Sequence, residues 1–398
     1  MKNTWRFGDQ ELTYVREVID SGFGSGTSGN MNNRFEKAFA EKEGAQWAVT
    51  FNSGTSTLHA ALDAMGVGTG DEVITTPLTV ISNLDVILAQ NAVPVFADID
   101  PETFNIDPAD IARKITPRTK AIMPVSLYGL PCDLDPIMAI AKDAGIMVLN
   151  DAAQAFQARY HGRLIAEIAD VTSYSTENSK HITTGDGGII VTNSETLATH
   201  IRKFGSLGYA AMTSGDGRIR INKDIFQNPN YRRHDMFSYN YRMPEVAAAL
   251  GLAQTERMDF FVRLRRDIAQ MFLDVMADCD YLTPQQVPTG YESSWWSVAA
   301  RYQRDDVSWE EFRQKNIELG GDGIYAAWAL LYQELVYSTG AWKKRCPPVY
   351  GHLPDRDPEC PNAEMLQPQL MQFVNNYGSK DEAAPKVEAL AKTIAFFE

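Results

Sequence analysis

The stretch Ser175-Thr-Glu-Asn-Ser-Lys-His-Ile-Thr-Thr-Gly-Asp-Gly-Gly188 decides how this chain is interpreted, and it leads directly into the apolar segment Ile189–Thr192. Lys180 lies in its middle, and the glycines at its end let the backbone pass close to another group or form a tight turn. Upstream, Asp151 follows the apolar run Ile146–Leu149. Because most lysines are solvated surface charges, the meaning of Lys180 depends on the segments around it.

Short β-rich runs alternate with helical patterns through the middle of the chain. Such alternation predicts a mainly parallel sheet covered by helices on both faces. Ligands bind beyond the carboxyl ends of the strands in such sheets. Asp151 and Ser175 both fall at strand ends, where catalytic groups are expected. The predicted strands are Glu72–Thr75, Val93–Ala97, Ala121–Val125, Ile146–Leu149, Val171–Tyr174 and Gly188–Thr192.

The remaining segments suggest two domains. Helices are expected from Asn32 and from Gly54, and the stretch Gly205–Tyr239 is rich in Gly, Asn, Asp and Arg, as a functional loop would be. A long helical run over Pro244–Met276 leads into a C-terminal α+β region. We therefore expect an α/β protein with a large domain over residues 1–245 and a smaller domain over residues 246–398.

Composition narrows the partners. The 398 residues are 44% hydrophobic and 22% charged, with a net charge of -14, which argues against nucleic acid or an anionic membrane surface as partner. The four cysteines lack the spacing of a zinc site, so no metal is expected. No run of about 18 apolar residues and no signal-type segment is present, and we expect a cytoplasmic location.

Lys180 and Asp151 together predict a site for pyridoxal phosphate (PLP). This cofactor needs an amine to hold its aldehyde as a Schiff base, and a carboxylate to keep its pyridine nitrogen protonated. Lys180 supplies the first group and Asp151 the second. Taken alone, Asp151 is equally well explained as a cap of a βα loop, and the neighbouring His181 is more often structural than a general base.

A phosphate site is expected at Asn52-Ser-Gly-Thr55, where hydroxyls and free backbone N–H groups stand at a helix start. A plain Ser/Thr helix cap explains the same residues. Ser175 precedes Lys180 by a short loop, which could place its hydroxyl at the phosphate while the amine reaches the aldehyde.

With these residues assembled, the chain resembles the DegT-type (nucleotide-)sugar aminotransferase family of fold-type-I PLP enzymes. The resemblance runs from about Ser21 to Arg263 and is weaker beyond. It implies an aspartate-aminotransferase-like large domain and a smaller α+β C-terminal domain. The motifs that carry it are Asn52-Ser-Gly-Thr55, Gly70–Ile74, Pro94–Asp100, Tyr128–Pro131, Asp151–Gln154, Thr183–Gly188, Tyr239–Met243 and Ala247–Gln254.

The resemblance implies a role for each matching residue. Lys180 would form the Schiff base and move the proton, Asp151 would pair with the pyridine nitrogen, and Gln154 would lie near the phenolic oxygen of the ring. The phosphate would be held by Gly54, Thr55 and Ser175.

Asn240 would reach the phosphate of a neighbouring subunit, which makes a homodimer the expected active unit. The substrates would be an amino-acid donor, glutamate or glutamine, and a keto-sugar, with a nucleotide attached.

Three features depart from the family pattern on the substrate side. Val80 stands where an aromatic ring usually covers the cofactor, and Ser126 where a His is frequent. Leu164-Ile-Ala166 displaces the Gly that often follows the Gly-Arg pair. Three alternatives stay open: a PLP-dependent sugar dehydratase, an aminocyclitol (inosose-type) aminotransferase, and a non-catalytic sensor. The dehydratase branch has His in place of the lysine, so the presence of Lys180 favours amino transfer, and a sensor would need neither Lys180 nor Asp151.

Overall fold

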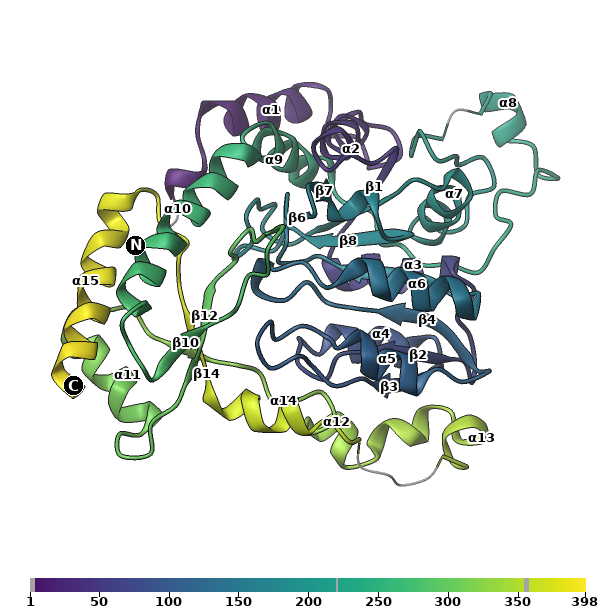
Figure 1. Ribbon diagram of the computed structural model, residues 1–398. Helices are drawn as coiled ribbons and strands as arrows, with labels where there is room; N and C mark the ends of the chain where they lie inside the picture. Colours follow the sequence, from purple (N-terminus) through teal and green to yellow (C-terminus); the bar gives the residue numbers. More distant parts are fainter. Residues whose placement is uncertain (1–3, 220, 354–357) are drawn as a thin grey trace.

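The computed structural model describes residues 4–219, 221–353 and 358–398. A seven-stranded sheet forms the centre of the described chain (Figure 1), with the strand order β1-β9-β8-β5-β4-β2-β3. The five strands from β8 to β3 are parallel, whereas β9 is antiparallel to both of its neighbours, which confirms the predicted mainly parallel sheet. The strands are β1 (Trp47–Phe51), β2 (Glu72–Thr75), β3 (Val93–Phe96), β4 (Thr119–Met123), β5 (Met147–Asp151), β8 (Val171–Ser175) and β9 (Gly188–Thr192).

Helices cover both faces of this sheet because its strands are apolar on both sides. In β9, Ile189 and Val191 pack toward α2, α6 and α9, while Ile190 packs toward α3, α4 and α7. An apolar run such as Ile189–Val191 predicts this two-sided burial for a strand in a sheet that helices cover on both faces. The helices are α2 (Met31–Lys42), α3 (Gly54–Ala64), α4 (Ser82–Ala89), α5 (Pro108–Lys114), α6 (Leu134–Ala144), α7 (Glu195–Phe204) and α9 (Glu245–Glu256).

A second hydrophobic core, formed by the C-terminal part of the chain, lies to the left of the seven-stranded sheet in Figure 1. There an antiparallel sheet, in the order β10-β12-β14-β13, packs against α10, α11 and α15. This α+β layout agrees with the predicted smaller domain, whereas the division at residue 245 stays a prediction. The elements are α10 (Met258–Met276), β10 (Leu282–Pro284), β12 (Val298–Tyr302), α11 (Trp309–Glu318), β13 (Tyr325–Ala326), β14 (Leu370–Phe373) and α15 (Lys380–Phe397).

The long helical run predicted over Pro244–Met276 is two helices, α9 and α10, which meet at Arg257. The backbone of Arg257 leaves the helical region, with φ -109° and ψ 9°. Its guanidinium donates to the carbonyl oxygen of Arg6 at 2.6 Å and pairs with Glu11. The junction therefore binds the N-terminal segment, a long-range contact that helical periodicity does not report.

The C-terminal chain returns to the large sheet before it enters β14. Leu330 and Tyr350 pack with Leu84 and Phe96, and the N–H of Leu331 donates to the carbonyl of Pro77 at 2.9 Å. This segment therefore borders the loop that carries Val80. It contains α12 (Leu335–Ser338), η4 (Ala341–Arg345), α13 (Pro347–Tyr350), α14 (Pro361–Leu366) and η5 (Gln367–Gln369).

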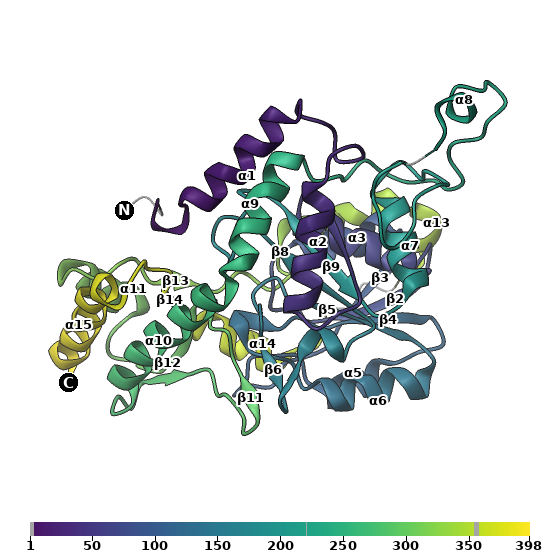
Figure 2. The same cartoon turned by 90° about the horizontal axis from the view of Figure 1, so that it is seen from above.

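Residues 205–219 and 221–241 are called the arm from here on, and the part of it around α8 projects from the body of the molecule (Figure 2). The helix labelled in the arm is α8 (Lys223–Phe226). Phe237 is 81% exposed and Ile225 is 52% exposed, so the arm presents apolar side chains outward. The other elements are η1 (Thr4–Arg6), α1 (Asp9–Asp20), η2 (Leu127–Gly129), β6 (Arg159–Tyr160), β7 (Arg163–Leu164), η3 (Ile165–Glu167) and β11 (Tyr291–Glu292).

Two kinds of feature are absent from the described residues. None of their helices is long and apolar enough to cross a bilayer. Their His, Cys, Asp and Glu side chains form no group of three or more arranged to hold a metal ion.

Candidate active site

Strand register brings the predicted phosphate residues together. Phe51 pairs with Gly188 and Gly188 with Ser175, so the chain leaving β1 passes beside the end of β8. A side chain at Gly188 would place its Cβ 2.5 Å from the carbonyl oxygen of Ser53. Glycine is therefore required here for the turn before α3 to approach the sheet.

The start of α3 forms a cradle around Gly54 and Ser175. A Cβ on Gly54 would lie 2.9 Å from Cβ of Ser175, so Gly54 keeps the space between them open. Ser53 caps the helix by accepting from the N–H of Ser56 at 3.1 Å, which leaves the N–H groups of Gly54 and Thr55 without intrahelical partners. The Thr55 hydroxyl is 2.8 Å from the Ser82 hydroxyl. The helix-cap interpretation and the phosphate interpretation are thus compatible, because they use different groups.

Asp151 is a buried carboxylate at the end of β5, with 2% of its surface exposed. Oδ1 accepts one hydrogen bond, from the N–H of Ala153 at 3.0 Å, and no ion pair to Asp151 occurs within the described residues. Burial raises its pKa, and the Ala153 N–H, the Asn83 amide and the positive charge of Lys180 oppose that rise. A buried carboxylate with so few partners suits a cationic ligand group.

Gln154 and the Tyr128-Gly129 turn join the site to the second core. Oε1 of Gln154 accepts from the N–H of Tyr128 at 2.6 Å, while no described residue accepts from its Nε2. Tyr128 has φ 58° and Gly129 has φ 103°. A Cβ on Gly129 would lie 2.5 Å from the N of Trp295, so this glycine lets the loop before β12 come close.

Lys180 lies in the lysine loop, residues 176–187, which connects β8 to β9. Its Nζ is 4.5 Å from the ring centre of Trp296. Burial lowers the pKa of the amine to about 8, Glu177 and Asp151 oppose this shift, and Arg265 adds to it. The electrostatic influence of Lys180 and Asp151 on each other is consistent with their predicted roles on one ligand.

Two buried arginines hold the backbone of the lysine loop. Arg6 donates to the carbonyl oxygens of Asn178 and Lys180, both at 2.6 Å, and to that of His181 at 2.9 Å. Arg265, on α10, donates to the carbonyls of Ser179 at 2.7 Å and Lys180 at 3.0 Å. Four consecutive carbonyl groups are therefore fixed by cationic donors from distant parts of the chain.

His181 is held as a neutral, structural residue. Its Nε2 is 2.9 Å from the carbonyl oxygen of Ser294, which can only accept, so Nε2 carries the proton. Burial and the nearby Arg265 move its pKa well below the usual value. Its ring also packs on Phe156, with ring centres 5.3 Å apart. These contacts favour the structural interpretation over the general-base one.

Asn240 is exposed at the base of the arm, as Thr55 is at the start of α3. Its backbone forms a bridge with Ser206, and its side chain makes no hydrogen bond to the described residues. The next residue, Tyr241, accepts from the N–H of Asn52 at 2.8 Å, which places the arm base beside the turn before α3. Val80 is 37% exposed in the loop before α4.

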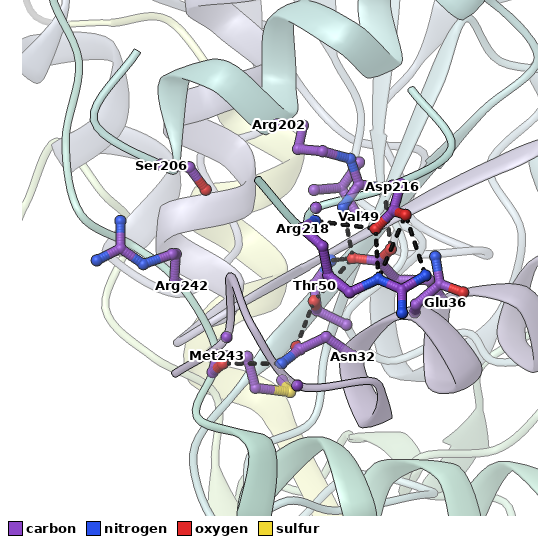
Figure 3. A pocket seen from close by; sticks show the side chains of 14 residues that line it. Asn32, Glu36, Val49, Thr50, Arg202, Ser206, Asp216, Arg218, Arg242 and Met243 are labelled. Carbon is purple, nitrogen blue, oxygen red and sulfur yellow. Dashed lines mark hydrogen bonds and ion pairs between the residues drawn. The ribbon is translucent and has the colours of Figure 1, made fainter. Parts of the chain in front are cut away.

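The pocket in Figure 3 lies apart from Lys180 and Asp151 and has a volume of only about 30 Å³. Several of its polar groups pair with one another: Arg202 with Glu36, Thr50 with Asn32, and Arg218 with Asp216. Nη1 of Arg242, which also lines the pocket, is buried without a hydrogen-bond partner among the described residues. The volume of the pocket is too small for a cofactor or a sugar substrate.

Several residues at the site carry no local signal in the sequence. Arg6, Arg265 and Trp296 reach the lysine loop from three distant segments. Asn83, which is fully buried beside Asp151, was also not among the site residues predicted from the sequence. Only the paired tryptophans in Ser293–Ser297 offered a hint, because large aromatic residues in a short loop are often anchors.

The sheet order, the second antiparallel core and the lysine loop together define an aminotransferase fold. The chain belongs to the DegT/DnrJ/EryC1/StrS aminotransferase family, whose model matches residues 6–371.

Similar proteins agree with this assignment. The chain is 40% identical to a GDP-perosamine synthase of Escherichia coli O157:H7 over 263 residues, which are 66% of this chain and 67% of that protein. It is 40% identical to the spore coat polysaccharide biosynthesis protein SpsC of Bacillus subtilis over 262 residues, 66% of this chain and 65% of that protein. The crystal structure of an aminotransferase from Psychrobacter cryohalolentis superposes with a TM-score of 0.84 at 29% identity, covering 98% of both chains.

Proposed function

We propose that this chain is a PLP-dependent aminotransferase that moves an amino group from glutamate or glutamine to a nucleotide-linked keto-sugar, in the biosynthesis of an amino sugar. The observation that carries the proposal is the buried Asp151 carboxylate, which lacks an ion pair within the described residues and is electrostatically coupled to Lys180. The family membership and the relatives, two of which are named for amino-sugar or polysaccharide synthesis, support the same reaction class.

The residues present fit PLP. When bound, this cofactor supplies an aldehyde that carries the amino group and a ring that withdraws electrons from the bond being broken. The cradle kept open by Gly54 beside Ser175 suits a phosphate, and Thr55 adds a backbone N–H and a hydroxyl. Asp151 would hold the proton on the pyridine nitrogen, and the free Nε2 of Gln154 would donate to the ring oxygen.

Lys180 would bind the aldehyde and move the proton between the substrate carbon and the cofactor. A pKa of about 8 leaves a useful fraction of the amine neutral near pH 7 to 8, as a nucleophile and base must be. Lys180 also argues against the dehydratase alternative, in which His replaces this residue.

A homodimer is part of the proposal. The exposed Asn240 side chain, free of hydrogen bonds to the described residues, is available to the phosphate of a second subunit. The outward apolar side chains of the arm, Phe237 and Ile225, give such a subunit a surface to pack on.

The test begins with the purified protein. With PLP it should show a visible absorption band that borohydride abolishes, and mass spectrometry should then find the reduced cofactor on the peptide with Lys180. Glutamate should remove the band, and GDP-4-keto-6-deoxymannose should restore it with release of an amino sugar. Attachment of PLP elsewhere than Lys180 would overturn the cofactor assignment, and failure of every nucleotide-linked keto-sugar would overturn the substrate class.

A further inference from the structure

The amine of Lys180 lies against an aromatic face rather than against a carboxylate. Its Nζ is 4.5 Å from the ring centre of Trp296, and no hydrogen bond or ion pair joins Nζ to another described residue. A cation over an indole face is attracted by the negative charge of the π-system, more strongly when both are shielded from water. Trp296 is thus the direct electrostatic contact of this amine.

The indole ring is held in place from several sides. Its Nε1 donates to the carbonyl of Ser179 at 3.1 Å, which ties the ring to the residue before Lys180. Its backbone N–H donates to the carbonyl of Tyr128 at 2.9 Å, and its carbonyl accepts from Arg265 at 2.6 Å. Trp328 stacks near it, with ring centres 6.3 Å apart and planes at 22°. Because the ring is fixed to the lysine loop itself, the amine and the ring keep their relative positions.

Three charged groups face Lys180 besides the ring. Glu177 in the lysine loop and Asp151 at the end of β5 favour the ammonium form, whereas Arg265 on α10 disfavours it, as does burial. Glu177 is also engaged by the N–H and the hydroxyl of Ser179. Neither carboxylate reaches Nζ, so the ring face occupies a position that an acidic partner could have taken.

We propose that Trp296 is a positioning residue that holds the cationic amine of Lys180 over its indole face, next to the cofactor site, whenever the amine is not bonded to the cofactor. The role of the amine rests on the proposed function, whereas the contact itself is a property of the protein without cofactor. This contact between the amine and the indole face would keep the amine and its proton beside the reacting carbon throughout the transfer.

The test measures the pKa of the Lys180 amine in the protein freed of PLP. The rate of labelling by 1-fluoro-2,4-dinitrobenzene is followed across pH by mass spectrometry of the Lys180 peptide, with exposed lysines of the same sample as reference. Trp296→Phe and Trp296→Leu are compared because both lose the bond from Nε1 to Ser179, but only Phe keeps an aromatic face.

In Trp296→Leu the pKa should fall by about one pH unit, a tenfold change in the protonation equilibrium, and in Trp296→Phe by less than about half as much. No fall in Trp296→Leu, or equal falls in both variants, would overturn the proposal. The visible band of wild-type protein with PLP is judged separately: its absence would overturn the proposed function while leaving the amine–indole result intact.

A second measurement needs no Trp296 variant, so it tests the contact even if those variants fail to fold. Tryptophan fluorescence of the cofactor-free protein should change as the amine loses its proton near pH 8, and this change should be missing in Lys180→Met. An identical fluorescence titration in Lys180→Met would contradict the contact.

Discussion

The lysine loop and the arm, both on the side of the sheet where the site lies, are held in opposite ways. In the lysine loop, Arg6 and Arg265 bind four consecutive carbonyl groups, and Trp296 binds Ser179 as well. The arm instead leaves Phe237 81% exposed and the Asn240 side chain without a hydrogen bond to the described residues.

This difference distinguishes the part of the site that one subunit forms alone from the part that we expect to need a second subunit. A loop fixed by buried, charge-assisted bonds is already in its working geometry, so its residues should act without help from a second subunit. The exposed apolar side chains of the arm, Phe237 and Ile225, have no such support, and we infer that they gain contacts in a dimer. Changes in the lysine loop should therefore abolish chemistry, and changes in the arm should weaken cofactor binding.

The largest effect is expected for Lys180→Ala. It removes the amine that would bind the aldehyde and move the proton, so turnover should be lost, while PLP should still bind through its phosphate. Turnover with a keto-sugar and a binding titration with PLP measure the two effects. Lys142→Ala, an exposed lysine on α6, is the matched control and should keep wild-type rates. Near-normal turnover in Lys180→Ala would remove this residue from the chemistry.

Asp151→Asn should follow, with turnover lower by about 10²–10³-fold. Asparagine has nearly the same shape but cannot keep the pyridine nitrogen protonated, so the cofactor would withdraw electrons less well. Rates, PLP retention and thermal unfolding should be compared with those of Asp143→Asn, an exposed change on α6. If the spectrum and the rate of Asp151→Asn equal those of wild type, Asp151 is only a loop cap.

A smaller effect is expected for Asn240→Ala in the arm. Loss of one hydrogen bond to a phosphate should weaken PLP affinity by about 1–2 kcal/mol, or about five- to thirty-fold, with the rate at saturation little changed. Asn230→Ala, an exposed change in the same arm, should leave the affinity unaltered.

A mixed dimer tells whether Asn240 acts across subunits. A chain with Lys180→Ala is paired with a chain carrying Asn240→Ala. If the contact is made in trans, the one site that keeps Lys180 also receives an intact Asn240, and it should bind PLP as wild type does. A working site with the Asn240→Ala affinity would mean that the contact lies within one chain.

The last prediction changes no residue and concerns a pH dependence set by the lysine loop. Burial lowers the pKa of Lys180 to about 8, so the amine is mostly protonated below pH 8 and mostly neutral above it. Because only the neutral amine attacks an aldehyde, PLP capture by the cofactor-free protein should rise nearly tenfold per pH unit up to about pH 8 and then level off. Stopped-flow absorbance measures this, and a profile that keeps rising to pH 10 would indicate an unshifted lysine.

Local pattern predicted much of the fold. The apolar runs around β2, β5 and β9 predicted their strands closely, because strands buried on both faces of a sheet are mostly apolar. Strand ends likewise predicted where Asp151 and Ser175 lie. These features depend on neighbours in the sequence.

Features that depend on distant segments were not predictable in this way. The break between α9 and α10 depends on Arg257 binding Arg6 and Glu11, and the setting of Lys180 depends on Arg265 and Trp296. No periodicity encodes a contact between segments so far apart. The family resemblance supplied the expected roles of the site residues, which stay predictions, but it did not indicate which groups hold those residues in place.

The hydrogen bonds that Arg6, Arg265 and Trp296 donate to the lysine loop also matter for synthesis on the ribosome. The strands on either side of the loop can pair as soon as β9 has emerged, but Arg265 and Trp296 follow much later in the chain. Arg6 is made early, but until Arg265 and Trp296 leave the exit tunnel the carbonyl group of Ser179 lacks both of its donors. We therefore expect the nascent chain to complete its central sheet before all the donors that fix the lysine loop have been synthesised.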